Sequence, residues 1–159
     1  MWWFKKKPSW EEQYAQNIYG AYVVSNDPGN ITALKLRIPT ALHHAYQNKI
    51  VLQRELISFA ALASVANPES GLGPVLLAYR DLLVDKMAKR GLEMSRDQLA
   101  NAACDDVEAM IADRDGWAQR WLSEFRDDPN DHYMVFEFAD HCVRLFQAWK
   151  GAIKNTRPR

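Results

Sequence analysis

The stretch LISFAALASVA, residues 56–66, decides the fold of this chain. Its apolar residues are interrupted only by Ser58 and Ser64, so a helix formed by it would be apolar on nearly every side. Such a helix is normally buried inside a protein, and about eleven residues are too few to cross a bilayer. The stretch therefore predicts the buried central helix of a bundle.

Helical periodicity continues toward the N-terminus. Apolar residues recur at helical spacing from Leu42 into the central stretch, and Thr40 lies where it can cap that helix. Farther upstream, Ser9 and Glu12 have the spacing of a capping box, and the periodic segment behind them reaches Tyr22. The first part of the chain is thus expected to hold two helices.

The second half of the chain has the same character. A third helix is expected from Pro74, which suits a first helical turn, to the basic residues before Gly91, which favours a helix end. Ser95 and Gln98 form a second capping box. The periodic segment behind it is weakened at 113–116, so it is expected to form one long helix or two shorter ones.

Together with a last helix that carries Phe138 and Trp149, these segments predict an all-α fold. The expected architecture is a compact bundle of about five helices around the buried second helix. Residues 31–39 alternate like a strand without a partner, so they are expected to form an extended connector packed on the helices. The expected core includes Ile18, Tyr46, Ile50, Leu56, Phe59, Leu76, Leu83, Val107, Ile111, Trp121, Phe138, Leu145 and Trp149.

Length and composition predict one globular domain. Of the 159 residues, 48% are hydrophobic and 25% are charged, as is usual for such domains. The domain is expected to span residues 1–159, with short extensions at 1–8 and 155–159. The aromatic start of the chain is too short for the apolar core of a secretory signal, and lysines follow it instead of preceding it. A cytoplasmic location is therefore expected.

Charge is unevenly distributed along a chain whose net charge is zero. Residues 1–96 hold 12 basic and 8 acidic side chains. Residues 97–140 hold 3 basic and 12 acidic side chains, and residues 141–159 hold 5 basic side chains and no acidic one. The neutral total argues against a general nucleic-acid binder, so no nucleic-acid partner is expected. The acidic block at 97–140 could attract a basic partner or the basic C-terminus of a second copy.

Histidine and cysteine spacings indicate no metal site or nucleophile. The H-E-x-x-H spacing is absent, so no metal or cofactor is expected from the four histidines. Cys104 and Cys142 lie on apolar helical faces and are expected to be buried thiols, although a disulfide between them stays open. Neighbouring carboxylates disfavour a reactive thiolate at either position. No catalytic residue is therefore assigned from these patterns.

Two pairs of carboxylates support an alternative, enzymatic interpretation. Asp105 and Glu108, like Glu137 and Asp140, are three residues apart and share a helix face. This pattern resembles the acidic signature of the all-α nucleotide pyrophosphohydrolases, and the resemblance implies Mg²⁺ held against substrate phosphates by these four residues. A straight hairpin with its turn near Pro129 would leave the two pairs roughly 20 Å out of register. Contact would require a break within residues 115–116.

The N-terminal segment Trp2-Trp3-Phe4-Lys5-Lys6-Lys7 combines aromatic side chains with lysines. Such a segment suits a partner's groove or an anionic membrane surface, and it could also fold back onto its own bundle. With the segregated charge, it favours a non-enzymatic protein that binds another protein or itself. Peripheral membrane attachment through the same six residues is a further alternative. The sequence identifies neither the partner nor the oligomeric state.

Overall fold

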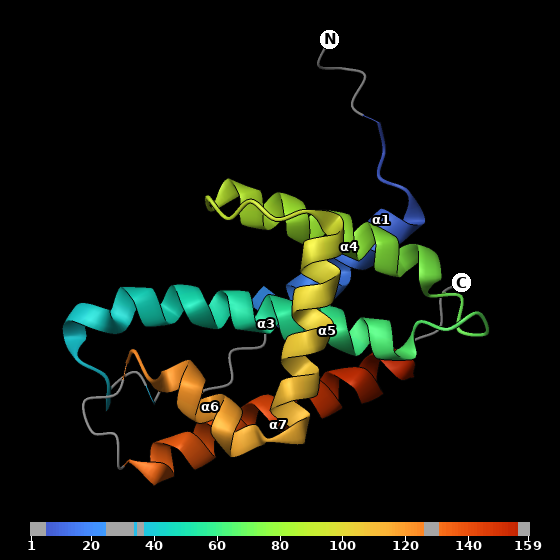
Figure 1. Ribbon diagram of the computed structural model, residues 1–159. Helices are drawn as coiled ribbons and strands as arrows, with labels where there is room; N and C mark the ends of the chain where they lie inside the picture. The colour runs from blue at the N-terminus through green and yellow to red at the C-terminus, as the bar shows by residue number, and fades with distance from the viewer. Residues whose placement is uncertain (1–5, 25–33, 35–36, 126–130, 156–159) are drawn as a thin grey trace.

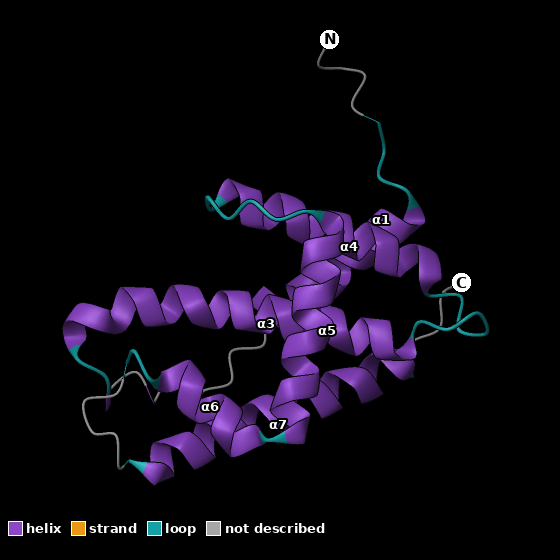
Figure 2. Ribbon diagram, in the orientation of Figure 1, coloured by secondary structure: helices purple, strands orange, loops and turns teal. Residues whose placement is uncertain are grey.

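The computed structural model describes residues 6–24, 34, 37–125 and 131–155. The all-α prediction is confirmed, and no strand occurs in these ranges (Figure 2). None of the helices found there is long and apolar enough to cross a membrane. The helices are α1 (Trp10–Ile18), the π-helical turn η2 (Tyr19–Val24), the 3-10 turn η4 (Thr40–Leu42), α3 (His43–Val65), α4 (Gly73–Lys89), α5 (Arg96–Ala112), α6 (Arg114–Leu122) and α7 (His132–Lys154).

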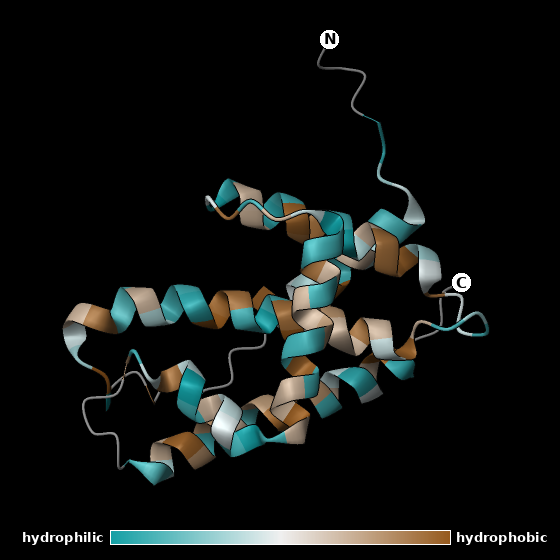
Figure 3. Cartoon of the chain, in the orientation of Figure 1, coloured by the Kyte–Doolittle hydropathy of each residue, from teal (hydrophilic) through white to brown (hydrophobic). Residues whose placement is uncertain are grey.

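The apolar stretch forms the second half of α3, which is the central helix of the bundle. α4 and α1 lie on one side of α3, and α7 and α6 lie on the other (Figure 1). α5 runs across α3 and contacts both groups. From Ile57 to Leu62 every residue of α3 is buried, as the absence of a polar face predicts. Along the other helices polar and apolar residues alternate (Figure 3).

Local capping signals fix two helix boundaries as expected, whereas the predicted cap at Thr40 is wrong. Thr40 begins η4, and Leu42 precedes α3 without a side-chain cap. The Ser95 hydroxyl accepts from the Gln98 amide at 3.1 Å, and the Gln98 side chain accepts from the Ser95 amide at 2.9 Å. At the end of α4, Gly91 has a φ of 84°, a left-handed conformation that glycine adopts without a Cβ clash. This conformation lets the Leu92 amide bond back to the Met87 carbonyl at 2.9 Å.

Six α-helices are described where about five were expected, because the weak point at 113–116 does separate two helices. Asp113 ends α5 and caps α6, since its side chain accepts from the Gly116 amide at 3.1 Å. Most of the expected extended connector lies outside the described residues. Of its described residues, Leu34 and Ile38 are both buried.

The predicted core is largely confirmed. Ten of the thirteen predicted side chains are buried, while Leu56 and Leu76 are half-buried and pack against the core. The prediction for Ile111 is wrong, because its side chain is 56% exposed. Met110, one position earlier, has no exposed surface and continues the buried face of α5 after Val107. The buried side chains on the predicted list are Ile18, Tyr46, Ile50, Phe59, Leu83, Val107, Trp121, Phe138, Leu145 and Trp149.

Candidate functional site

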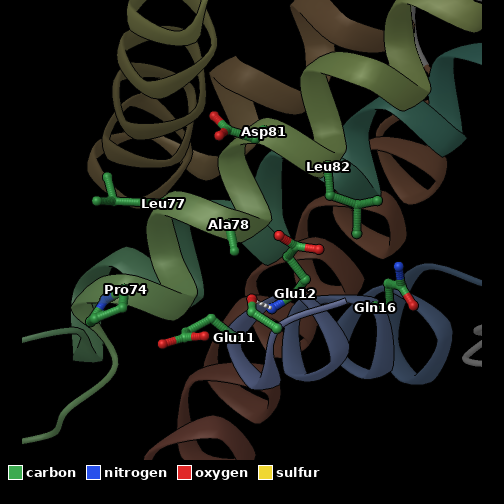
Figure 4. A pocket seen from close by; sticks show the side chains of 9 residues that line it. Glu11, Glu12, Gln16, Pro74, Leu77, Ala78, Asp81 and Leu82 are labelled. Atoms are coloured by element: carbon green, nitrogen blue, oxygen red, sulfur yellow. Dashed lines mark hydrogen bonds between the residues drawn. The ribbon is translucent and has the colours of Figure 1, made fainter. Parts of the chain in front are cut away.

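A groove of about 460 Å³ lies between α1 and α4 (Figure 4). It combines three carboxylates with a strip of apolar side chains, and Glu12 points from α1 toward α4. Concave surfaces of this size with a few polar groups are common binding sites. The groove is lined by Ser9, Glu11, Glu12 and Gln16 on the side of α1 and by Pro74, Leu77, Ala78, Asp81 and Leu82 on the side of α4.

Helix geometry explains why these residues share one surface. Along α4 the lining residues recur at intervals of three and four, so they form one stripe. On α1, the Ser9 hydroxyl accepts from the Glu12 amide at 3.2 Å and places both glutamates in the first turn. Negative side chains are favourable there because they interact with the positive end of the helix dipole. The preference for acidic residues in a first helical turn therefore places two negative charges, Glu11 and Glu12, along one edge of the groove.

The three carboxylates differ in how far their charge is compensated. Asp81 lies 2.9 Å from Nε of Arg96 and 3.6 Å from Nε of Arg80. In the described part of the chain, neither Glu11 nor Glu12 has an ion pair. The groove therefore keeps negative charge that a cationic side chain of a partner would meet.

Two large apolar side chains are exposed at this end of the molecule. Leu77, which lines the groove, is 52% exposed, and Trp10, the first residue of α1, is 46% exposed. Single exposed apolar residues are ordinary on protein surfaces. Leu77, however, continues an apolar strip with Pro74, Ala78 and Leu82 inside a concave surface.

In the sequence, the predicted interaction segment precedes Ser9, the first residue that lines this groove. Its residues Trp2, Trp3, Phe4 and Lys5 are outside the described residues. Lys6 and Lys7 are exposed, and the chain from Lys6 to Pro8 leads from α1 away from the bundle (Figure 1). The lysines that the structure describes are thus presented to solvent and not to the groove of their own chain.

The four carboxylates of the alternative enzymatic interpretation are spread over two helices. Asp105 and Glu108 are exposed on α5. On α7, Glu137 lies 3.7 Å from Arg37, and Asp140 ion-pairs with Arg114 and Arg144. In the described ranges, no group of three or more His, Cys, Asp or Glu side chains could hold a metal ion. The break after α5 does not gather the two pairs into such a group.

Basic side chains compensate part of the acidic block 97–140. Asp131 accepts two hydrogen bonds from Arg37, at 2.7 and 2.8 Å, and Glu124 accepts from Lys49 at 2.5 Å. The exposed rings of Tyr133 and Phe136 are each covered by an arginine, Arg37 and Arg114 respectively. The field predicted from the sequence is weaker in the fold than the count of charges implies.

A second groove of about 380 Å³ lies between α3, α5 and α6. Several of its polar groups already bond to one another: Asp106 accepts from Gln53 at 2.7 Å and from the Trp117 indole at 2.9 Å. The Trp121 indole in turn donates to the side-chain amide oxygen Oε1 of Gln53 at 2.9 Å. These bonds hold three helices together, so we assign this groove a structural role.

A buried polar cluster connects η2, α3 and the end of α4. Glu55 has no exposed surface, and it accepts hydrogen bonds from both terminal nitrogens of Arg90 and from the Tyr19 hydroxyl at 3.3 Å. Burial raises the pKa of Glu55, while the hydrogen bond and the charge of Arg90 act in the opposite direction. The Ser58 and Tyr79 hydroxyls bond to each other at 2.7 Å beside it. The hydrogen bonds of this cluster thus hold η2, α3 and α4 together within the core.

The two cysteines are free thiols in the structure. Cys142 is buried as expected, whereas Cys104 is only partly buried. Burial raises the pKa of both thiols, and the nearby charges of Glu108 and Asp105 raise that of Cys104 further. Neither environment activates a nucleophile, because the thiolate is the reactive form.

Sequence reasoning did not identify the groove between α1 and α4. The sequence predicts Glu12 as part of a capping box and Pro74 as the start of a helix, and neither pattern indicates a groove. The lining residues of α4 recur at helical spacing, but α1, which completes the groove, lies almost sixty residues earlier in the chain.

No protein-family model, curated protein or solved structure matches this chain.

Proposed function

We propose that the protein works by binding another protein, and that the groove between α1 and α4 holds an apolar, positively charged segment of its partner. One observation carries this proposal: the half-exposed Leu77 and the glutamates Glu11 and Glu12 line the same concave surface. Grooves that pair apolar and charged groups commonly receive amphipathic peptide segments.

Each part of the groove has a separate role in the proposed complex. Apolar side chains of the partner would pack against Pro74, Ala78 and Leu82, and this burial would supply most of the affinity. Lysines or arginines of the partner would lie near Glu11 and Glu12. Exposed charge pairs of this kind contribute mainly to orientation and to the rate of association. Binding should therefore weaken as salt concentration rises.

The proposal predicts binding of a model peptide that has the required chemistry. The probe is a fluorescently labelled 12-residue peptide of alternating Leu-Leu and Lys-Lys pairs, titrated with the full chain and followed by fluorescence anisotropy. The Leu77→Ala/Glu11→Gln/Glu12→Gln variant should bind it about tenfold more weakly, because it loses apolar contact and two charges. Glutamine keeps the shape of each side chain and is tolerated in a helix.

A matched control separates the groove from general attraction to negative charge. The Ile111→Ala/Asp105→Asn/Glu108→Gln variant removes one exposed apolar side chain and two exposed carboxylates from α5. It should bind the peptide as the parent protein does. Equal weakening in both variants, or no binding to either the parent protein or a chain that lacks residues 1–7, would contradict the proposal.

A further inference from the structure

We propose that the segment held by the groove is the N-terminus of a second copy of this chain, Trp2-Trp3-Phe4-Lys5-Lys6-Lys7. This inference rests on the proposed function and names the partner. It predicts a dimer in which each copy places its N-terminal segment in the groove of the other.

The order of residues in the segment matches the chemistry of the groove. Three aromatic side chains precede three lysines, and the groove offers an apolar strip along α4 beside the carboxylates of Glu11 and Glu12. Aromatic side chains that fill a partner's pocket are common energetic centres of interfaces. The lysines would supply the opposite charge that Glu11 and Glu12 lack in the described part of the chain.

The lengths of segment and groove also agree. Six extended residues span roughly 20 Å. The stripe from Pro74 to Leu82 rises by about 12 Å along α4. The segment can therefore cover the stripe and still leave residues to connect the two copies.

The direction of the chain favours exchange between copies over self-binding. Ser9 lines the groove, but Lys6, Lys7 and Pro8 are exposed and lead away from the bundle (Figure 1). In the described part of the chain, Lys6 and Lys7 form no ion pair with the glutamates of their own groove. Mutual exchange of such segments gives a closed twofold dimer, which is the most common symmetric assembly.

Charge reversal on each side tests this inference in the full-length protein. Sedimentation velocity at low salt should show a dimer for the parent chain. The Lys5→Glu/Lys6→Glu/Lys7→Glu variant and the Glu11→Lys/Glu12→Lys variant should each raise the dimer dissociation constant at least tenfold. A chain that carries all five substitutions should regain the dimer, because the charges are again opposite.

Deletion of residues 1–7 provides a second test that does not alter α1, and it should give a monomer. A monomeric parent chain, or a dimer that survives the deletion, would overturn the inference. A parent chain that is monomeric but sediments with vesicles of phosphatidylserine and phosphatidylcholine would also overturn it, in favour of a membrane role for the segment. If the parent chain is monomeric and yet binds the Leu–Lys peptide in the groove, the proposed function stands and only this inference fails.

Discussion

Replacing Phe138 by alanine is expected to lower the unfolding free energy by about 4 kcal/mol, the largest effect that we predict. Phe138 has no exposed surface. The centroid of its ring lies 5.7 Å from that of the Trp117 ring, on which it stacks, and 4.4 Å from that of the Trp121 ring. The substitution would therefore leave a cavity where α6 packs on α7 and remove two aromatic contacts.

Phe136 provides the matched control for this prediction. It lies on the same helix, two residues earlier, and is 51% exposed with Arg114 over its ring at 5.3 Å. Phe136→Ala should cost no more than about 1 kcal/mol, since it loses one exposed cation–π contact and little burial. Urea unfolding followed by circular dichroism measures both variants. If Phe138→Ala and Phe136→Ala lowered the unfolding free energy by similar amounts, the described burial of one face of α7 would be wrong.

The second large effect is expected when Arg90 is replaced by alanine. Glu55 would then be left buried without its cationic partner, and breaking a buried pair in this way typically costs about 3–5 kcal/mol. We expect about 3 kcal/mol, because the Arg90 side chain is 35% exposed and solvent screens part of the interaction. This loss corresponds to a fall in melting temperature of roughly 6–12 °C.

The pH dependence of this variant provides an independent check. Burial raises the pKa of Glu55, so the folded state binds its proton more readily than the unfolded state does. Stability therefore falls as pH rises through the interval between the ordinary value of 4.5 and the raised pKa. Without Arg90 the pKa rises further and this interval widens. The deficit of the variant relative to the parent should thus shrink as the pH is lowered toward 4.5.

Lys89 serves as the control for Arg90. It precedes Arg90 at the same end of α4 and forms an ion pair with Asp85 at 3.0 Å. The side chains of both Lys89 and Asp85 are more than half exposed. Lys89→Ala should therefore change stability by no more than about 0.5 kcal/mol. The account of the buried cluster would be wrong if thermal unfolding gave the same loss for both variants, or if the Arg90 deficit did not depend on pH.

The sequence predicts those parts of the fold that local physical chemistry determines. The apolar stretch forms the buried half of α3, Ser95 caps α5, and Gly91 follows the end of α4. The error at Ile111 has a local cause. Met110 and Ile111 are adjacent apolar residues in the last turn of α5, and periodicity alone could not decide which of them faces the core.

Features that depend on the packing of distant segments could not be predicted in the same way. Glu55 directly precedes the apolar stretch of α3, and because it is buried its charge requires a partner. The identity of that partner, at the end of another helix, is set by how α4 packs on α3. The groove is likewise formed only when α1 and α4 meet.

The most direct test of the central claim is to map the Leu–Lys peptide on the uniformly ¹⁵N-labelled protein by chemical-shift perturbation. The account predicts saturable shifts concentrated at residues 9–16, which comprise the N-cap and most of α1, and at residues 75–82 of α4. Little change is expected around Gln53, Trp117 and Trp121. Shifts centred on that second groove, or spread evenly over the acidic side chains of α5 and α7, would contradict it.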